Sequence, residues 1–263
     1  MTTNAPGAAV LVKSVPIGGR FLRIENGRLS REGVAHGLDP INEVCIEWAL
    51  QARSLGTLSR VSAIAMGPDL AADSLRRALA MGCDDAMLIA DPKLSGAGVR
   101  LTAQALAAAV HRAGVGLALF GNESLDGSSG TVPSAVATIL DWPLLSLART
   151  ATIKNGTLRG SRDMGAGAEV AEVELPAVVS FVAGGVDPHY PKLKEIFTAR
   201  KAPLAKIGLN DLSVNAAEFP PGERVIGLVE APESARRVTR VMNAEEGVDE
   251  LIHLLESVGP KSG

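Results

Sequence analysis

Four short, continuous apolar runs in the first half of the chain constrain its fold more than any other feature. They are residues 8–12, 61–66, 86–90 and 115–120. Helix signals separate them, because Asp39-Pro40 pairs a capping residue with a first-turn proline, and Gly82 and Gly114 stand where helices end. Short apolar runs that alternate with helices are typical of parallel strands buried on both faces. The sequence therefore predicts an α/β fold with right-handed crossovers.

The loop after the fourth apolar run is the first candidate site. Residues 121–131 contain three glycines and three serines, and helical spacing resumes over residues 132–140. At the carboxyl end of a strand, such a loop places backbone N–H groups and the positive end of a helix where an anion can bind. Asp126 and the hydroxyls at 128, 129 and 131 add polar groups, although an ordinary helix cap explains the same residues. The loop matches neither G-x-G-x-x-G nor G-x-x-x-x-G-K-[ST].

Turn signals and alternating patterns organise the rest of the chain. Asn26-Gly27 and Asn155-Gly156 each predict a tight hairpin turn. The runs 146–153, 157–162, 169–175 and 177–182 predict an added β-meander, and a helix is expected over 191–201. We expect a Rossmann-like domain over residues 1–202, with a parallel sheet and helices on both faces.

Residues 203–263 have a different character. Prolines stand at 203, 220, 221 and 232, and regular patterning is weak until a helix expected over 244–258. Apolar residues recur in that helix at helical spacing, which suits docking. The segment is expected to be an extended C-terminal arm, either flexible or laid against a partner.

Composition excludes several classes of function. A net charge of −3 and an aromatic content of 3% give no reason to expect nucleic acid or an anionic membrane as partner. Cys45 and Cys83 lie outside metal or redox spacing, so we expect no metal site and a reducing compartment. No apolar run reaches the ~18 residues of a membrane helix, and residues 1–7 lack the layout of a signal peptide. A soluble, cytoplasmic protein without membrane insertion is expected.

Nine separated segments then match one family in order and spacing. They are Val10-Leu11-Val12-Lys13, Asp39-Pro40, Met66-Gly67-Pro68, residues 78–84, residues 121–126, Asp141-Trp142-Pro143, residues 175–179, Asp187-Pro188-His189-Tyr190-Pro191 and residues 199–203. Along nearly its whole length the chain resembles the β subunit of electron transfer flavoproteins.

The resemblance implies a heterodimer with an α subunit that holds the redox FAD. A β subunit of this kind usually carries AMP, forms one wall of the flavin site and presents a loop to a partner dehydrogenase. The flavin takes electrons from the dehydrogenase and passes them to a quinone oxidoreductase or another acceptor. The β subunit then supplies no catalytic residue and is an electron-carrier subunit rather than an enzyme.

Carried over by position, the resemblance also implies a nucleotide site. Leu11 and Met66 would sandwich an adenine, Asp39 and Asn42 would reach the ribose or the base edges, and the loop would take the phosphate. The full set is Leu11, Asp39, Pro40, Ile41, Asn42, Met66, Gly121, Asn122, Glu123, Ser124, Leu125, Asp126, Gly127, Ser128, Ser129, Gly130, Thr131 and Val132.

The occupant of that site has three alternatives. Family members commonly have Asp-x-Asp-x-x-Gln in the loop, whereas here Asp126 is followed by Ser128 and Thr131. AMP, a second FAD as in a flavin-bifurcating relative, and an empty site in a purely structural subunit are all open. A nucleotide-hydrolysing or adenylyl-transferring enzyme ranks lower, because it needs a phosphate-gripping lysine or an acidic metal cluster near residues 121–133, and neither is visible in the sequence there.

The segment just before the helix expected over residues 191–201 is the candidate partner surface. The family places a bulky apolar anchor just before the Asp-Pro-His-Tyr motif, and Val186 is the only apolar residue of any size there. Val186, His189 and Tyr190 are therefore expected to face the partner dehydrogenase.

Overall fold

The computed structural model describes residues 5–17, 23–25, 28–30, 33–165, 167–222 and 243–257. The chain divides into two compact units, residues 1–226 and 227–263. Each unit is described by itself.

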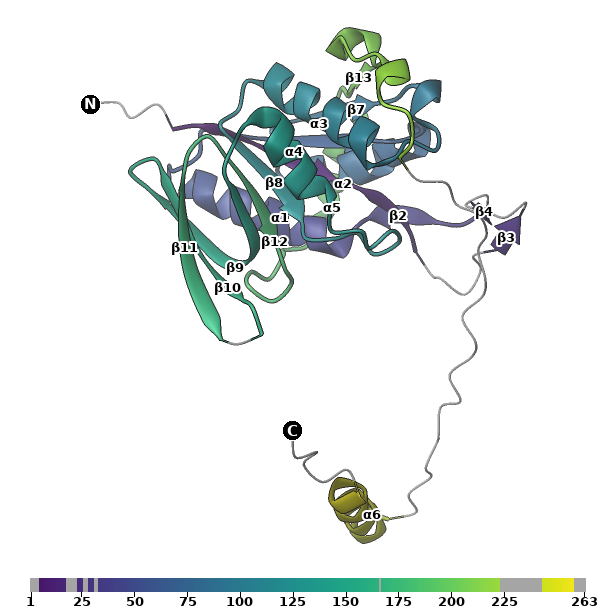
Figure 1. The fold of residues 1–263 in the computed structure, drawn as a ribbon, viewed down its shortest axis with the longest axis vertical. Coiled ribbons are helices and arrows are strands. Elements are labelled where there is room, and N and C mark those ends of the chain that lie inside the picture. Colours follow the sequence, from purple (N-terminus) through teal and green to yellow (C-terminus); the bar gives the residue numbers. More distant parts are fainter. Residues whose placement is uncertain are drawn as a thin grey trace. The chain divides into compact units, whose positions relative to one another are not determined.

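The first unit is built on a nine-stranded sheet (Figure 1). Its order is β11-β10-β9-β12-β8-β1-β6-β7-β13. The strands are β1 (Gly7–Val12), β6 (Arg60–Met66), β7 (Asp85–Ile89), β8 (Leu117–Gly121), β9 (Leu144–Lys154), β10 (Thr157–Asp163), β11 (Ala168–Glu174), β12 (Ala177–Phe181) and β13 (Ala205–Ile207). From β9 through to β13 every neighbouring pair is parallel, whereas β9, β10 and β11 pair antiparallel. The expected α/β class is confirmed, and so are the first three strands of the meander.

Helices cover both faces of this sheet, as expected. They are α1 (Pro40–Ser54), α2 (Ala72–Met81), α3 (Val99–Ala113), α4 (Val132–Leu140) and α5 (Leu193–Lys201). Side chains alternate along β1, so Val10 packs in a core cluster with α1 and α2, while Leu11 packs in a second cluster with α3 and α4. The first four apolar runs are therefore central strands.

The predicted helix ends are confirmed. The Asp39 side chain caps α1 by accepting a hydrogen bond from the N–H of Ile41, and Pro40 occupies the first turn. Gly82 and Gly114 end α2 and α3 in the left-handed conformation, which costs glycine little because it has no Cβ.

The prediction that residues 177–182 continue the meander is wrong. The strand β12 leaves β11 and inserts between β8 and β9, parallel to both. All five of its residues are buried, whereas β11 alternates and exposes Glu169 and Glu172. A strand that is apolar on both faces gains more from a central position than from an edge.

Short strands lie between β1 and α1. The strands β3 (Arg23–Glu25) and β4 (Arg28–Ser30) form the hairpin expected around Asn26-Gly27, whose two turn residues lie outside the described residues. A second pair, β2 (Ser14–Pro16) with β5 (His36–Leu38), had no clear sequence signal.

Residues after 202 still contribute to the first unit. The strand β13 extends the sheet beside β7, and Leu209, Leu212 and Val214 are buried in the second core cluster. The division after residue 226 thus differs from the expected boundary at 202, because these apolar side chains complete the core.

The second unit contains α6 (Ala244–Ser257), close to the helix expected over 244–258. Its apolar residues Val248, Leu251, Ile252 and Leu255 are exposed. None of the helices in the described ranges has both the length and the apolar character needed to cross a membrane.

Candidate functional site

The candidate site lies where the adjacent parallel strands β1 and β8 end. The strand β8 ends at Gly121, residues 122–131 form the loop, and α4 begins at Val132 with Pro133 in its first turn. The N–H of Asn122 donates to the carbonyl of Phe181 at 2.8 Å, so the start of the loop is also tied to β12. The loop therefore starts from the middle of the sheet.

Gly121 lies against the first turn of α1. A Cβ built on Gly121 would be 2.3 Å from Cγ2 of Ile41, closer than such atoms can approach. Only glycine allows this contact without a shift of Ile41. The structure thus brings two predicted site residues, distant in sequence, into direct contact.

Asp39 and Asn42 hold the surrounding backbone. Oδ2 of Asp39 accepts a hydrogen bond from the N–H of Leu125 at 2.9 Å, in addition to its role as helix cap. Oδ1 of Asn42 accepts from the N–H of Lys13 at 2.8 Å, and its Nδ2 donates to the carbonyl of Leu11 at 3.3 Å. Both side chains are at least 96% buried. They join α1, the end of β1 and the loop.

Lys13 is a site residue that sequence reasoning missed. Its Nζ lies 2.5 Å from Oδ1 of Asp126 and 2.9 Å from Oγ of Ser124. The Asp126 side chain is only 6% exposed, whereas that of Lys13 is 46% exposed. No local sequence signal marks Lys13, because its contact with the loop depends on the pairing of β1 with β8. The chain nevertheless places a lysine beside the loop.

The distal half of the loop is exposed and rich in hydroxyls. Ser128 and Gly130 have positive φ, and Ser128 donates through both its N–H and its Oγ to the carbonyl of Ser124. Ser129 accepts from the hydroxyl of Thr131. Thr131 stands at the cap position of α4, but its side chain makes no capping hydrogen bond.

These donors fit an anionic group such as a phosphate. Three hydroxyls, the N-terminal turn of a nine-residue helix and the ammonium of Lys13 lie along one loop. Carboxylates are also present, and the one on Asp126 is paired with Lys13. Hydroxyl, ammonium and helix N-terminal N–H groups are donors of the kind that phosphate oxygens accept.

The remaining predicted site residues are described by their packing and exposure. Leu11 and Met66, at the ends of the adjacent strands β1 and β6, both pack in the second core cluster. Pro40 and Glu123 are exposed, and Val132 is half-buried. Among the residues that the structure describes, no group of three or more His, Cys, Asp and Glu side chains could hold a metal ion.

The candidate partner surface lies elsewhere, between β12 and α5. Val186 is half-buried against the first core cluster. Tyr190 is 84% exposed, and the guanidinium carbon of Arg77 lies over the Tyr190 ring, 5.6 Å from the ring centroid. The ring Nδ1 of His189 is hydrogen-bonded to Glu47 on α1. The segment is thus fixed to α1 and α2 by polar contacts.

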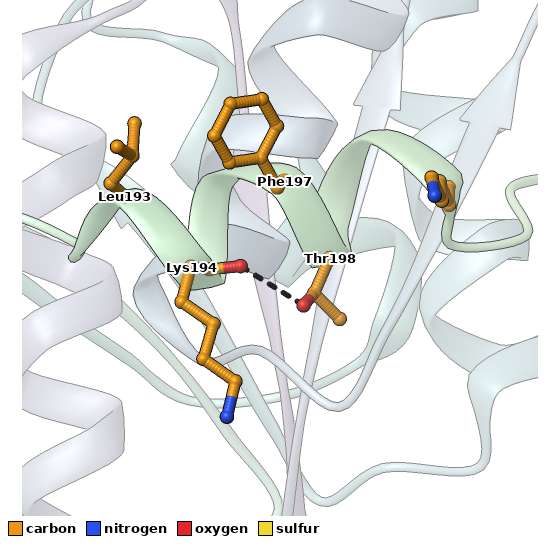
Figure 2. Close-up of a pocket in the computed structure, with 5 residues that line it drawn as sticks. Leu193, Lys194, Phe197 and Thr198 are labelled. Atoms are coloured by element: carbon orange, nitrogen blue, oxygen red, sulfur yellow. Dashed lines mark hydrogen bonds between the residues drawn. The ribbon is translucent and has the colours of Figure 1, made fainter.

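A hollow of about 570 Å³ lies on α5, the helix that follows this segment in the chain. Figure 2 shows Leu193 and Phe197 on one side of the helix, with Lys194 and Thr198 on the other. Leu193 and Phe197 are both more than half exposed. The exposed apolar groups of this region are therefore Tyr190, Leu193 and Phe197 more than Val186.

Glu47, which is hydrogen-bonded to His189, has a shifted pKa. Burial opposes its ionisation, but hydrogen bonds from the His189 ring, from Gln51 and from the His189 N–H outweigh that effect. The pKa of Glu47 therefore lies below its ordinary value.

Comparison with known proteins gives a consistent result. Residues 27–212 match the family described as "Electron transfer flavoprotein domain". The chain is 33% identical over 257 residues to the electron transfer flavoprotein subunit beta of Mycobacterium leprae, covering 94% of this chain and 96% of that one. It is 30% identical over 239 residues to the corresponding Bacillus subtilis subunit, covering 89% and 91%, and 28% identical over 207 residues to that of Sus scrofa, covering 75% and 81%.

Proposed function

The chain belongs to the electron transfer flavoprotein β-subunit family, and from that premise we propose that it works as the β half of a heterodimeric electron carrier. Electrons from a partner dehydrogenase reach an FAD held mainly by the α subunit and pass on to a quinone oxidoreductase or another acceptor. When bound, FAD supplies the redox chemistry. The observation that carries the proposal is the family match over most of the chain.

We propose that the loop after β8 holds the phosphate of AMP. The exposed hydroxyls of Ser128, Ser129 and Thr131, the start of α4 and the ammonium of Lys13 support this assignment. In this proposal Leu11 and Met66, at the ends of the neighbouring strands β1 and β6, flank the adenine. Asp39 and Asn42 act mainly by holding the loop and the end of β1 in place, since both side chains already bind backbone groups.

This chain contributes binding and orientation rather than proton transfer. The polar side chains nearest the loop are engaged: Asp39 with a backbone N–H, and Lys13 with Asp126 and Ser124. Such contacts fix the geometry of a bound nucleotide. No catalytic acid or base is needed from this subunit for electron transfer.

Docking to the two protein partners is assigned to different surfaces. The C-terminal arm, with the exposed apolar side of α6, is proposed to bind the α subunit. Val186, His189 and Tyr190, continued by the apolar side of α5, are proposed to face the dehydrogenase. Exposed aromatic residues such as Tyr190 are typical anchors of protein interfaces.

Cofactor extraction tests the proposal. The chain is co-expressed with its α subunit, the purified complex is denatured, and released nucleotides are identified by mass spectrometry and counted per complex. One FAD with one AMP is expected. Two FAD per complex would contradict the AMP assignment and indicate a bifurcating relative, and FAD alone would show that the β8 loop holds no nucleotide.

A further inference from the structure

Within the described part of the chain, hydrogen bonds attach the loop after β8 to the rest of the first unit at three places. Asn122 bonds to β12, Leu125 bonds to Asp39 at the start of α1, and the pair Ser124 and Asp126 bonds to Lys13 at the end of β1. Asn122 and Leu125 are attached by their backbone N–H groups. The Lys13 attachment joins side chains, and its two loop residues flank Leu125.

Hydrogen bonds through Ser124 also connect Lys13 to the distal half of the loop. Oγ of Ser124 accepts from the Lys13 ammonium at 2.9 Å and from the N–H of Gly127 at 3.3 Å. The carbonyl of the same serine accepts both hydrogen bonds from Ser128. A displacement of Ser124 would therefore move Gly127 and Ser128, which lead into the hydroxyl-rich segment before α4.

The contact between Lys13 and Asp126 also changes the net charge of the loop. The carboxylate of Asp126 is almost completely withdrawn from water, so its charge depends on close partners, and Lys13 lies at ion-pair distance. Removing Lys13 takes one positive partner away from this carboxylate, in a loop suited to an anion. The lysine thus both shapes the loop and lowers its repulsion of a phosphate.

We propose that Lys13 and Asp126 form a clasp that closes the β8 loop over a nucleotide phosphate and sets the rate at which that nucleotide leaves. The clasp rests on the proposed nucleotide site. It makes Lys13 a positioning residue whose effect reaches the ligand through Ser124 and Asp126. The neutral variant Lys13→Met opens the clasp while keeping a side chain of similar length.

The experiment compares heterodimers carrying K13M, D126N or both with the unmodified heterodimer and with Lys206→Met. Lys206 on β13 pairs with Asp69 at 2.6 Å, so K206M removes an exposed lysine–aspartate pair from the edge strand of the same sheet. Release of isotopically labelled AMP and hydrogen exchange of residues 121–132 are measured. We expect about tenfold faster release and faster exchange in K13M, with K206M unchanged.

The double variant separates a clasp from two independent residues. If Lys13 and Asp126 act as one unit, K13M/D126N releases AMP no faster than K13M alone. Release and exchange rates in K13M equal to those of the unmodified protein would overturn the clasp, as would a multiplicative effect in the double variant. An unmodified heterodimer without bound nucleotide would overturn the proposed site and its control of nucleotide release. Hydrogen exchange in K13M would then show separately whether Lys13 holds the loop.

Discussion

His189 and Glu47 join the segment before α5 to the middle of α1. The ring Nδ1 of His189 is hydrogen-bonded to Oε2 of Glu47, and the His189 N–H donates to the same oxygen at 3.3 Å. Oε1 of Glu47 accepts from Gln51 at 2.9 Å. One largely buried carboxylate thus fixes a segment 142 residues away in sequence.

Replacing Glu47 by Gln should lower the free energy of unfolding by about 1–2 kcal/mol at neutral pH, because the amide is a weaker acceptor for the His189 ring. Chemical denaturation measures the change. Glu172→Gln is the control, since its pair with Arg159 is exposed and should contribute less than about 0.5 kcal/mol. Equal stability of the two variants would show that the contact with His189 contributes little.

The same residue predicts a pH dependence. The folded-state pKa of Glu47 is depressed, so its stabilising effect is fully present above the ordinary value of about 4.5 and is lost as the pH falls through the lower folded-state pKa. The stability difference between unmodified protein and Glu47→Gln should therefore narrow below about pH 4.5. Denaturation curves at stepped pH measure this. A gap that widens with acidification would contradict the assigned direction.

Local signals predicted most of the fold, because each strand and helix is encoded within a few residues. The Asp39 cap and the glycines at 82 and 114 set helix ends that depend only on neighbouring backbone. The place of β12 was missed, since the choice of strand partner depends on burial across the whole sheet. The three-residue strand β13 was missed for a different reason, because so short a run has no periodicity of its own.

In the candidate site, too, locally encoded features were predicted and long-range contacts were not. The loop between Gly121 and Val132 has a local signature, and the sequence predicted it. Lys13 has none, because its relation to Asp126 spans 113 residues and exists only through the pairing of β1 with β8. The hydrogen bond from the Leu125 N–H to Asp39 likewise depends on tertiary packing, which local sequence does not reveal.

Asp126→Ala should lower the nucleotide content of the heterodimer without unfolding it. The change removes the carboxylate that Lys13 binds, while Asp39 still holds the N–H of Leu125. The ratio of released nucleotide to protein measures the effect, and Asp163→Ala, an exposed aspartate on β10, is the control. Unchanged occupancy in the Asp126 variant would remove that residue from the site.

Gly121→Ala should destabilise the fold by about 1–3 kcal/mol, because the new methyl group would overlap Ile41. The helix α1 would have to move away from the loop, so nucleotide content should fall as well. The double variant with Ile41→Ala removes the overlapping atoms. If the cost is steric, thermal denaturation should show a smaller loss for the added Gly121 change in that background, and an equal loss would point to another cause.

Removing residues 227–263 should abolish co-purification with the α subunit while leaving the first unit folded. The cut follows the boundary between the two units, whereas a cut at 203 would also remove β13 and the buried Leu209 and Leu212. Circular dichroism of the truncated chain reports on folding, and affinity purification through a tagged α subunit reports on binding. A truncated chain that still co-purifies one-to-one would show that the second unit is not needed for docking.

Leu251→Glu should weaken binding to the α subunit at least about tenfold, because a charge would replace an exposed apolar group on the side of α6 proposed to dock. His253→Glu is the matched control, since two residues of helix place position 253 on the opposite side of α6. Each variant is co-expressed with tagged α subunit, and the ratio of the two chains is measured at increasing dilution. Weaker binding of the Leu251 variant alone would locate docking on the apolar side of α6. Equally weak binding of both variants would mean that added negative charge, rather than a lost apolar contact, weakens the complex.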